Sequence, residues 1–412
     1  MALIVQKYGG TSGGSVARIH AVAEQVASLR AQGYQVAVVV SAMGDSTDRL
    51  LDLARQLSPT PSSRELDALL ATGEMVSCAL LAMALCDRGW PAKSYNALQL
   101  PLTTSGVHGR ARIEGIECAG LKADCAAGVV PVFTGFQGRG PDGSVTTIGR
   151  GGSDTSAVAL AVALQAEECQ ILTDVDGVYT ADPRIVPDAR RLDRISFEEM
   201  LEMAGQGSRV LHLRSVEFAA RYGMRLRVLS SFRSGPGTLI CEEDTQVEAP
   251  VVAGIAFNRD EAEITVSGLP DRPGMAHALL EPVAAESIEV DMIVVNAPRE
   301  GRVDFTFTVH RDDYGRACQL VAPVAARLGA AVRGDDRVAK LAVVGSGMRS
   351  HAGVASRVFA TLAQEGINVR LVSTSEIKIS VLVAERELEQ AARALHAAFG
   401  LSGQRSGAWP LD

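Results

Sequence analysis

A lysine and several glycines near the start of the chain are the first residues suited to chemistry on an anion. The stretch KYGGTSGGS, Lys7–Ser15, places one ammonium beside four glycines. Glycines leave backbone N–H groups uncovered, and such groups together with an ammonium can bind a phosphate or a similar anion. The other interpretation is a tight turn whose lysine lies on a solvated rim. The stretch alone is compatible with both.

A second glycine-rich stretch, GRGGSDTSA, covers Gly149–Ala157 between a strand-like run (VTTIG) and a helical run. Ser153 is typical of a helix N-cap, and Asp154 then falls in the first turn, where the helix dipole favours a carboxylate. We expect Arg150 on the buried side of this turn, where its guanidinium can bind a carboxylate through two hydrogen bonds. The sequence has no G-x-x-x-x-G-K-[ST] loop, so any phosphate chemistry is not of the P-loop type.

A third stretch, TDVDGVYTADPR, covers Thr173–Arg184 and leads from a strand end into an Asp-Gly turn and an Asp-Pro stop. Taken alone, it is an ordinary turn. Together with the two glycine-rich stretches it forms a specific set.

The elements that must position these stretches alternate through about residue 235. The predicted strands are LIVQKY, QVAVVVSAM, VVPVFTGF, QILTDV and LRVLSS, and the predicted helices are Ala17–Ala31, Ser63–Asp87 and Thr155–Leu164. This alternation predicts an α/β fold with a mainly parallel sheet and helices on both faces. Ligands of such sheets bind at the carboxyl ends of the strands, which is where the glycine-rich turns fall.

The composition changes around residues 233–250, where the polar, acidic stretch RSGPGTLICEEDTQVEAP, rich in Gly and Pro, is predicted to be a linker. Beyond it the chain repeats itself at an offset of 79 residues, so that Gly268 aligns with Gly347 and Gly274 with Gly353. Each copy has the pattern strand, turn, helix, strand, which predicts a pair of small α/β units. The stretch VVGSGMRS resembles a dinucleotide-binding loop, but Ser350 replaces its third glycine and the repeat explains it better.

Composition excludes several classes of protein. With 412 residues and a formal net charge of −8, the chain is a poor candidate for binding nucleic acid or an anionic membrane. Its longest apolar runs, CALLAMALC and AVALAVAL, are shorter than the ~20 residues of a membrane helix, and the N-terminus lacks the pattern of a signal peptide. Seven scattered cysteines without a C-x-x-C pair favour reduced thiols and a cytoplasmic location.

Five motifs together resemble those of aspartate kinases. They are KYGGTS, SAMG-x-x-T (Ser41–Thr47), TGE (Thr72–Glu74), GRGGSD and TDVDGVYTADPR, in this order. The resemblance covers essentially the whole chain, and the duplicated tail is similar to the paired ACT units of those enzymes. It implies the amino acid kinase fold for residues 1–245 and a regulatory region for residues 246–412. That region has two ferredoxin-like ACT units, at about 264–335 and at about 338–412, the second completed by a strand from 250–262.

The implied reaction transfers the γ-phosphoryl group of ATP, the co-substrate, to the side-chain carboxylate of L-aspartate. The products are 4-phospho-L-aspartate and ADP, and the step is the first toward lysine (through diaminopimelate), threonine and methionine. A carboxylate with a solution pKa of ~4 is already ionised at neutral pH, so no strong general base is required. The obstacle is the repulsion between an anion and a polyanion, which positioning and positive charge must overcome.

The resemblance also implies roles for individual residues. Lys7 stabilises the moving phosphoryl group, and Asp154 holds Lys7 in place. The aspartate-binding residues are Arg150 for the α-carboxylate, Glu74 for the α-ammonium, and Ser41, Thr47, Gly151, Gly152 and Ser153. The nucleotide-binding residues are Lys7, Tyr8, Gly9, Gly10, Thr173, Asp174, Tyr179, Arg184 and Arg209. Mg²⁺ arrives with ATP, held mainly by phosphate oxygens and water rather than by a protein metal site.

Some of these residues have simpler interpretations. Glu74 can be a charge on the surface of an amphipathic helix. Tyr179 can belong to ordinary packing, and Arg184 can belong to a surface ion pair. Four positions depart from the family pattern. Tyr8 replaces a phenylalanine, Gly13 a valine and Arg209 a lysine, and Val295 replaces a glutamine of effector-binding relatives.

The ACT units imply feedback inhibition by lysine, threonine or both, and a homo-oligomer formed through these units. The candidate effector residues of the first unit are Asp271, Arg272, Pro273, Gly274, Met275, Ala276, Glu289 and Asp291. Those of the second unit are His351, Gly353, Val354, Asn368 and Glu376. A separate regulatory subunit made from the tail is a further possibility, and the alternative role of the ACT units is dimerisation alone.

Two rival functions stay open at this point. One is an amino acid kinase that acts on glutamate, acetylglutamate or carbamate, although those relatives lack the combination of TGE, GRGGSD and an ACT pair. The other is a catalytically silent amino-acid sensor. The presence of Lys7, Glu74, Arg150 and Asp154 argues against silence.

Overall fold

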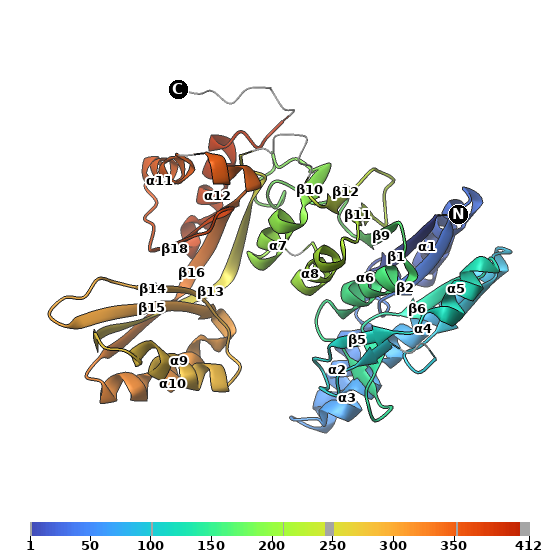
Figure 1. Ribbon diagram of the computed structural model, residues 1–412, viewed down its shortest axis with the longest axis horizontal. Helices are drawn as coiled ribbons and strands as arrows, with labels where there is room; N and C mark the ends of the chain where they lie inside the picture. Colours follow the sequence, from blue (N-terminus) through green and yellow to red (C-terminus); the bar gives the residue numbers. More distant parts are fainter. Residues whose placement is uncertain (1, 100–101, 209, 244–250, 352, 404–412) are drawn as a thin grey trace. The chain divides into compact units, whose positions relative to one another are not determined.

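The computed structural model describes residues 2–99, 102–208, 210–243, 251–351 and 353–403, which form two compact units (Figure 1). For the residues described, unit 1 comprises Met1–Val178, Arg191–Ala204 and Arg209–Gln246. Unit 2 comprises Tyr179–Arg190, Gly205–Ser208 and Val247–Asp412. Two short stretches of the N-terminal part, 179–190 and 205–208, therefore fold with the C-terminal part.

Unit 1 is built on an eight-stranded sheet in the order β10-β12-β11-β9-β1-β2-β6-β3. All neighbouring strands are parallel except β11 and β12. The strands are β1 (Leu3–Tyr8), β2 (Gln35–Val40), β3 (Ala92–Tyr95), β6 (Val130–Thr134), β9 (Glu168–Thr173), β10 (Arg194–Ser196), β11 (Leu226–Ser230) and β12 (Thr238–Cys241). The predicted mainly parallel sheet is confirmed.

The predicted linker is wrong in one respect. Strand β12 lies inside it and inserts into the sheet between β10 and β11. Its four residues, TLIC, are too short a run to stand out from the polar residues around them. Residues 244–250 of the predicted linker lie outside the described part of the chain.

Helices cover both faces of this sheet. They are α1 (Val16–Ala31), α2 (Ser46–Leu57), α3 (Ser63–Leu70), α4 (Thr72–Asp87), α5 (Ala119–Ala126), α6 (Gly152–Leu164), α7 (Phe197–Gly205) and α8 (Leu213–Tyr222). Successive residues of a strand point to opposite faces. Tyr8, Val38 and Val40 pack with α1 and α4 in one apolar core. Lys7, the neighbour of Tyr8, therefore points to the opposite face, where it contacts Asp154 of α6.

The predicted single helix Ser63–Asp87 is divided at Ala71 into α3 and α4. The backbone carbonyl of Ala71 accepts a hydrogen bond from Nε2 of Gln137 at 3.0 Å. By length and composition, Ser63–Asp87 is the one stretch of the described residues apolar enough to cross a membrane, and half of its most apolar window is buried. Leu81 and Leu85 are fully buried against α1 and the sheet, so we interpret it as a core helix pair.

A second, smaller sheet of unit 1 leads the chain into α6. It contains β4 (Leu102–Thr104), β5 (Ile113–Ile116), β7 (Gln137–Arg139) and β8 (Val145–Thr147), in the order β5-β4-β7-β8. Two residues after the end of β8, the chain reaches the GRGGSD turn at Gly149, which leads into α6.

Unit 2 is an antiparallel sheet in the order β14-β15-β13-β16-β18-β17. Its strands are β13 (Gly254–Pro270), β14 (Val290–Val295), β15 (Arg302–His310), β16 (Ala331–Val344), β17 (Leu371–Thr374) and β18 (Lys378–Ala384). Its helices are α9 (Met275–Ala285), α10 (Tyr314–Arg327), α11 (Val354–Gln364) and α12 (Leu388–Ala398). Helices α9 and α10 lie side by side in one half, and α11 and α12 form a pair in the other (Figure 1). The predicted pair of ferredoxin-like units is confirmed.

Strands β13 and β16 each run through both halves of this sheet. Gly254–Asn258 pairs with Lys340–Val344 in one half, and Glu263–Ser267 pairs with Ala331–Asp335 in the other. The register shifts between Asn258 and Glu263, at the junction. Each half has its own apolar core.

The repeat of the sequence reappears as a repeat of conformation. Gly274 and Gly353 are both helix N-caps in the left-handed region, with φ of 91° and 101°. The dinucleotide-like stretch VVGSGMRS instead forms the end of β16 and a short 3-10 helix, Ser346–Ser350, in the second half of the repeat.

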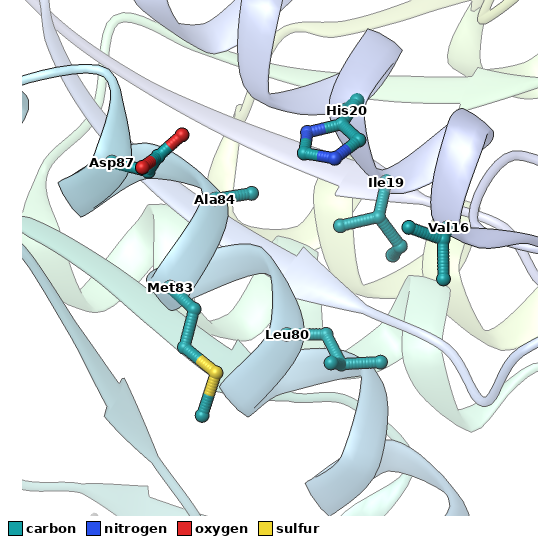
Figure 2. A pocket seen from close by; sticks show the side chains of 7 residues that line it. All are labelled: Val16, Ile19, His20, Leu80, Met83, Ala84 and Asp87. Atoms are coloured by element: carbon teal, nitrogen blue, oxygen red, sulfur yellow. The ribbon is translucent and has the colours of Figure 1, made fainter.

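Helix α4 offers a matched pair of residues for a test of the core. Leu81 is fully buried, whereas Met83 is 65% exposed and lines an open apolar groove between α1 and α4 (Figure 2). We expect Leu81→Ala to lower the free energy of unfolding by about 2–5 kcal/mol, because it leaves a cavity, and Met83→Ala to change it by less than about 0.5 kcal/mol. Urea unfolding followed by Trp90 fluorescence, in a Trp409→Phe background, measures this. Equal effects of the two substitutions would contradict the assignment of α4 to the core.

Candidate active site

The ammonium of Lys7 lies at the carboxyl edge of the main sheet, beside the start of α6. Its Nζ is 2.7 Å from Oδ1 of Asp154, and the two side chains are only 11% and 13% exposed. The contact is not aligned as a hydrogen bond, so the attraction is mainly that of two charges. Because Lys7 lies near the end of a strand and Asp154 in the first turn of a helix, the pair joins the two glycine-rich stretches at one place.

The first glycine-rich turn packs closely against the loop after β2. A side chain at Gly10 would approach the carbonyl of Ala42 to 3.0 Å, and the N–H of Gly44 donates to the carbonyl of Gly10 at 3.0 Å. The N–H of Gly9 donates to the carbonyl of Leu172 at 3.2 Å, so it is not available to a ligand in this structure. The N–H of Gly10 donates to no backbone carbonyl of the described chain. Of the two predicted donors, Gly10 therefore fits an anion better.

Tyr8 does not fit its predicted role as a nucleotide contact through its side chain. That side chain is 2% exposed and lies in the core on the α1 side of the sheet. Its hydroxyl donates to Oε1 of Gln6 at 3.1 Å, and burial raises the pKa of Tyr8. The strand alternation that aims Lys7 at the site points Tyr8 away from it.

Glu74 is a buried carboxylate at the start of α4. Its side chain is 3% exposed, and its Oε1 accepts a hydrogen bond from the N–H of Ala42 at 3.1 Å. Its Oε2 is buried and has no hydrogen-bond partner among the described residues. Burial raises the pKa of Glu74 to about 7, against the opposing effect of backbone N–H groups. An orphan carboxylate oxygen of this kind suits a cationic ligand, and the interpretation of Glu74 as a surface charge is wrong.

Ser41 and Thr47 belong to the same edge of the sheet. The N–H of Ser41 donates to the carbonyl of Tyr8 at 3.1 Å, and its carbonyl accepts from Oγ of Ser77 at 2.8 Å. Thr47 lies in the first turn of α2, and both side chains are half-buried. The loop that carries them also contacts Gly10 and Glu74, so the structure brings these residues together.

The second glycine-rich turn begins α6 differently from the prediction. The N-cap is Gly151, with φ of 69°, and Ser153 is already the second residue of the helix. The ring of His212 occupies the place where a side chain on Gly151 would lie, 2.1 Å from its Cγ. Ser153 contacts Gly135 at the end of β6, which brings the first turn of α6 beside β6.

Arg150 is exposed, and the prediction of a buried arginine is wrong. It stands between Gly149 and Gly151, whose φ angles are 89° and 69°, and its side chain is exposed to solvent. Within the described part of the chain its guanidinium pairs with no carboxylate. Arg150 is therefore free to bind a carboxylate that comes from solution.

Two residues beside this turn were missed by sequence reasoning. The Nδ1 of His212 is buried without a hydrogen-bond partner in the described chain, and burial is the first cause that lowers the pKa of this imidazole. Phe136 has a φ of 69°, which is strained for a bulky residue, and its ring packs against Gly152. Neither residue belongs to a recognisable motif, because each reaches the turn only through the tertiary fold.

The predicted nucleotide residues do not all lie in unit 1. Thr173 ends β9 and Asp174 follows it, beside β1, and Oγ1 of Thr173 donates to Oδ1 of Asp174 at 3.1 Å. Tyr179 and Arg184 belong to unit 2. Arg184 pairs with Asp182 at 2.6 Å with its side chain 83% exposed, which is the surface ion pair considered as the alternative. Arg209 lies outside the described residues.

The predicted effector residues fall at corresponding places in the two halves of unit 2. Asp271–Gly274 form the turn before α9, Met275 and Ala276 begin that helix, and Glu289 and Asp291 lie around the start of β14. His351 and Gly353 lie in the turn before α11, Val354 is the first residue of that helix, and Asn368 and Glu376 flank β17. Val354 is only 6% exposed and packs in the core, so its side chain does not fit an effector contact.

Asp291 already has a cationic partner in the chain. Its carboxylate contacts Nζ of Lys340, which is 4% exposed and also lies 3.3 Å from Oε1 of Glu261. Any effector ammonium that binds Asp291 must therefore compete with, or lie beside, an internal ammonium.

Comparison with known proteins relates this geometry to a family. Residues 2–230 match the amino acid kinase family, and residues 341–399 match the ACT domain. The chain is 57% identical over 403 residues to "Aspartate kinase Ask_LysC" of Stutzerimonas stutzeri (strain A1501), covering 97% of this chain and 98% of that protein. It is 56% identical over 404 residues to an aspartokinase of Pseudomonas aeruginosa, covering 97% and 98% of the two chains.

Solved structures agree with this relationship. The structure of E. coli aspartokinase III in complex with aspartate and ADP is 27% identical, with a TM-score of 0.76 over 96% of this chain and 99% of that chain. The complex of E. coli aspartokinase III with lysine and aspartate is 25% identical, with a TM-score of 0.75 over 96% and 99% of the two chains.

The burial of Glu74 predicts how the free energy of unfolding depends on pH. The carboxyl is protonated in the folded and unfolded chain at low pH, but between pH 4.5 and about 7 the unfolded chain loses the proton first. The free energy of unfolding therefore falls as the pH rises through this window. Gln cannot ionise and keeps an oxygen for the N–H of Ala42, so we expect Glu74→Gln to be more stable than the parent by about 2–3 kcal/mol at pH 8.

Urea unfolding at pH 5 and pH 8 measures this difference. The gain should be much smaller at pH 5, where the parent carboxyl is still mostly protonated. A variant that is equally or less stable at pH 8 would show that the Glu74 carboxylate is well solvated or paired in the folded chain.

Proposed function

The chain belongs to the amino acid kinase family and is an aspartate kinase. On this premise, we propose a site for L-aspartate and the γ-phosphoryl group of ATP that is formed by Lys7, Glu74, Arg150 and Asp154. The observation that carries the proposal is the ion pair of Lys7 and Asp154, 2.7 Å apart where the two glycine-rich turns meet. It supports a fixed positive charge at the point where two anions must approach each other.

Aspartate is held at both of its α-substituents. Its ammonium pairs with Oε2 of Glu74, the buried oxygen that has no partner in the described chain. Its α-carboxylate pairs with the guanidinium of Arg150, and Ser41, Thr47 and Ser153 complete the pocket. These contacts leave the side-chain carboxylate of the substrate directed toward Lys7.

The reaction needs charge stabilisation more than proton transfer. An oxygen of the ionised side-chain carboxylate forms a bond to the γ-phosphorus of ATP, and the bond from that phosphorus to the bridging oxygen breaks as ADP leaves. No proton moves in this step, so no general base is required. Lys7 stabilises the charge on the phosphoryl oxygens, Asp154 keeps the ammonium in place, and the N–H of Gly10 supplies a further donor.

The phosphate end of ATP is assigned to the end of β9. Thr173 and Asp174 lie next to the strand of Lys7 and suit the phosphate end of ATP. The roles of Tyr179, Arg184 and Arg209 rest on the motifs alone. Mg²⁺ accompanies ATP and is held mainly by phosphate oxygens and water.

Regulation and assembly are assigned to unit 2. Lysine, threonine or both inhibit the enzyme through the ACT pair, and a homo-oligomer forms through its sheet, whose edge strand β14 exposes Ile293 and Val295. E. coli aspartokinase III, a relative of similar length, has been solved with lysine and aspartate. The enzyme acts in the cytoplasm, which suits its seven free thiols, at the first step toward lysine, threonine and methionine. A separate regulatory subunit from the tail is part of the same hypothesis.

Replacing Lys7 tests the mechanism. We expect Lys7→Ala to lower kcat by at least about 100-fold while the KM for aspartate changes by less than about 3-fold, because its ammonium acts on the transition state. The assay traps the acyl phosphate as a hydroxamate, with aspartate or glutamate as acceptor. Lys122→Ala, at an exposed lysine of α5, is the control and should leave both constants unchanged. A loss confined to KM would mean that Lys7 only binds substrate, and hydroxamate formed from glutamate but not aspartate would favour the rival kinases.

Effector binding is tested separately. Steady-state rates with lysine and threonine at millimolar concentration, alone and together, should fall for at least one of the three additions. Glu289→Gln, at an exposed effector residue far in sequence from the catalytic motifs, should weaken the inhibition and leave the uninhibited rate unchanged. Flat activity with all three additions would restrict the ACT pair to dimerisation.

A further inference from the structure

Asp67 is a buried carboxylate of unit 1 that the proposed mechanism does not use. It lies on α3, and its side chain is 2% exposed. It belongs to none of the motifs that indicate the function. A buried charge is costly unless it is fully hydrogen-bonded, so its partners show what it holds in place.

Three residues donate hydrogen bonds to this carboxylate. Oδ1 accepts from Oγ1 of Thr147 at 2.6 Å and from the N–H of Gly109 at 3.1 Å. Oδ2 accepts from the N–H of Thr147 at 3.0 Å, from the N–H of Gly109 at 3.0 Å and from Nδ1 of His108 at 2.8 Å. Asp67 therefore joins the 108–109 loop to the last residue of β8.

The last residue of β8 is close to the substrate-binding arginine. Thr147 is separated from Arg150 by Ile148 and Gly149 alone. Gly149 has a φ of 89°, and a side chain on it would lie 2.9 Å from the carbonyl oxygen of Gly109. Asp67 thus holds Gly109, whose carbonyl Gly149 approaches closely, as well as the strand end that leads to Arg150.

An arginine also holds the backbone that leads into this turn. Arg214 of α8 donates to the carbonyl of Ile148 at 2.7 Å and to the carbonyl of Ala111 at 3.3 Å. The N–H groups at this place are therefore held by a carboxylate, and the carbonyl groups are held by a guanidinium. The backbone entering the GRGG turn has little freedom to move.

Arg150 itself lacks such support. Its side chain is exposed, and among the described residues it pairs with no carboxylate. The direction in which it projects must therefore come from the backbone of its turn. A displacement of about 1 Å in a substrate-positioning group can cost on the order of 100-fold in rate.

We propose that Asp67 is a positioning residue for aspartate recognition: by fixing Thr147 and Gly109 it sets the place of Arg150, and through it the binding of the substrate α-carboxylate. The proposal rests on the proposed role of Arg150. It concerns a residue that touches neither substrate nor nucleotide, and it predicts that the effect of Asp67 disappears when Arg150 is absent.

A double-mutant cycle in the full chain tests this. Asp67→Asn keeps the size of the side chain but turns an NH₂ group toward donors that need an acceptor. We expect it to lower kcat/KM for aspartate by about 10- to 100-fold, mainly through KM, with the KM for ATP unchanged. In an Arg150→Ala background, Asp67→Asn should lower kcat/KM by less than about 2-fold.

Each outcome of the cycle has one meaning. If Arg150→Ala alone leaves kcat/KM for aspartate unchanged, the proposed role of Arg150 is wrong, and with it the present inference. If Arg150→Ala lowers it but Asp67→Asn does not, Arg150 keeps its role and Asp67 has none. If the two effects multiply, Asp67 supports the fold in general, and the positioning role is overturned.

Two further variants complete the test, one as an alternative to Asp67→Asn and one as a control. Thr147→Val removes one donor to Asp67 and keeps the shape of the buried side chain, so it should lower kcat/KM for aspartate by roughly 3-fold or more in the presence of Arg150 and not in its absence. It decides the question if Asp67→Asn does not fold. Glu65→Gln is the matched control on α3, because that side chain is 68% exposed, and it should have no effect on any constant.

Discussion

The ion pair between Lys7 and Asp154 is the interaction around which unit 1 is organised. Phosphoryl transfer to a carboxylate brings two anions together, so a cation must be fixed between them before they arrive. Neither partner can be placed by local structure alone, because Lys7 lies near the end of a strand and Asp154 in the first turn of a helix more than a hundred residues later. The parallel sheet solves this problem by bringing the end of β1 and the start of α6 to the same edge. Because both side chains are largely buried, solvent and salt screen the pair only weakly.

Close approach of backbones at this edge has a cost that the rest of the unit must offset. Glycine occurs where Gly10 meets the loop after β2, where Gly149 meets Gly109, and where Gly151 meets His212. Glu74 adds a buried carboxylate whose pKa is raised to about 7, and one of its oxygens has no hydrogen-bond partner among the residues that the structure describes. Both features reduce stability, and both make sense if the site is preformed for a charged substrate. Networks such as the hydrogen bonds to Asp67 supply the rigidity that the glycines do not.

Unit 2 follows a different constraint, since its two halves share strands β13 and β16. A strand that slips by one residue moves its apolar side chains to the opposite face, so neither half can change register independently of the other. The buried pair of Lys340 and Glu261 lies at the junction where the register shifts. Lys340 also contacts Asp291 at the start of β14, which links this junction to one of the proposed effector positions. The registers of the two halves are therefore coupled through the shared strands, even though each half has its own apolar core.

By itself, the sequence was sufficient for the fold class, the repeat in the tail and the types of residue that meet at the site, because these depend on local patterns: strand alternation, glycine-rich turns at strand ends and an offset of 79 residues. It was not sufficient to predict which side chains of the site are buried or which hydrogen-bond partners they have. It placed Arg150 inside and allowed Glu74 outside, whereas the structure has the reverse. It missed β12 within the predicted linker, and it gave no sign of Asp67, His212 or Phe136. Burial and hydrogen-bond partners are settled by segments distant in the chain, so they exist only once the sheets and helices have packed.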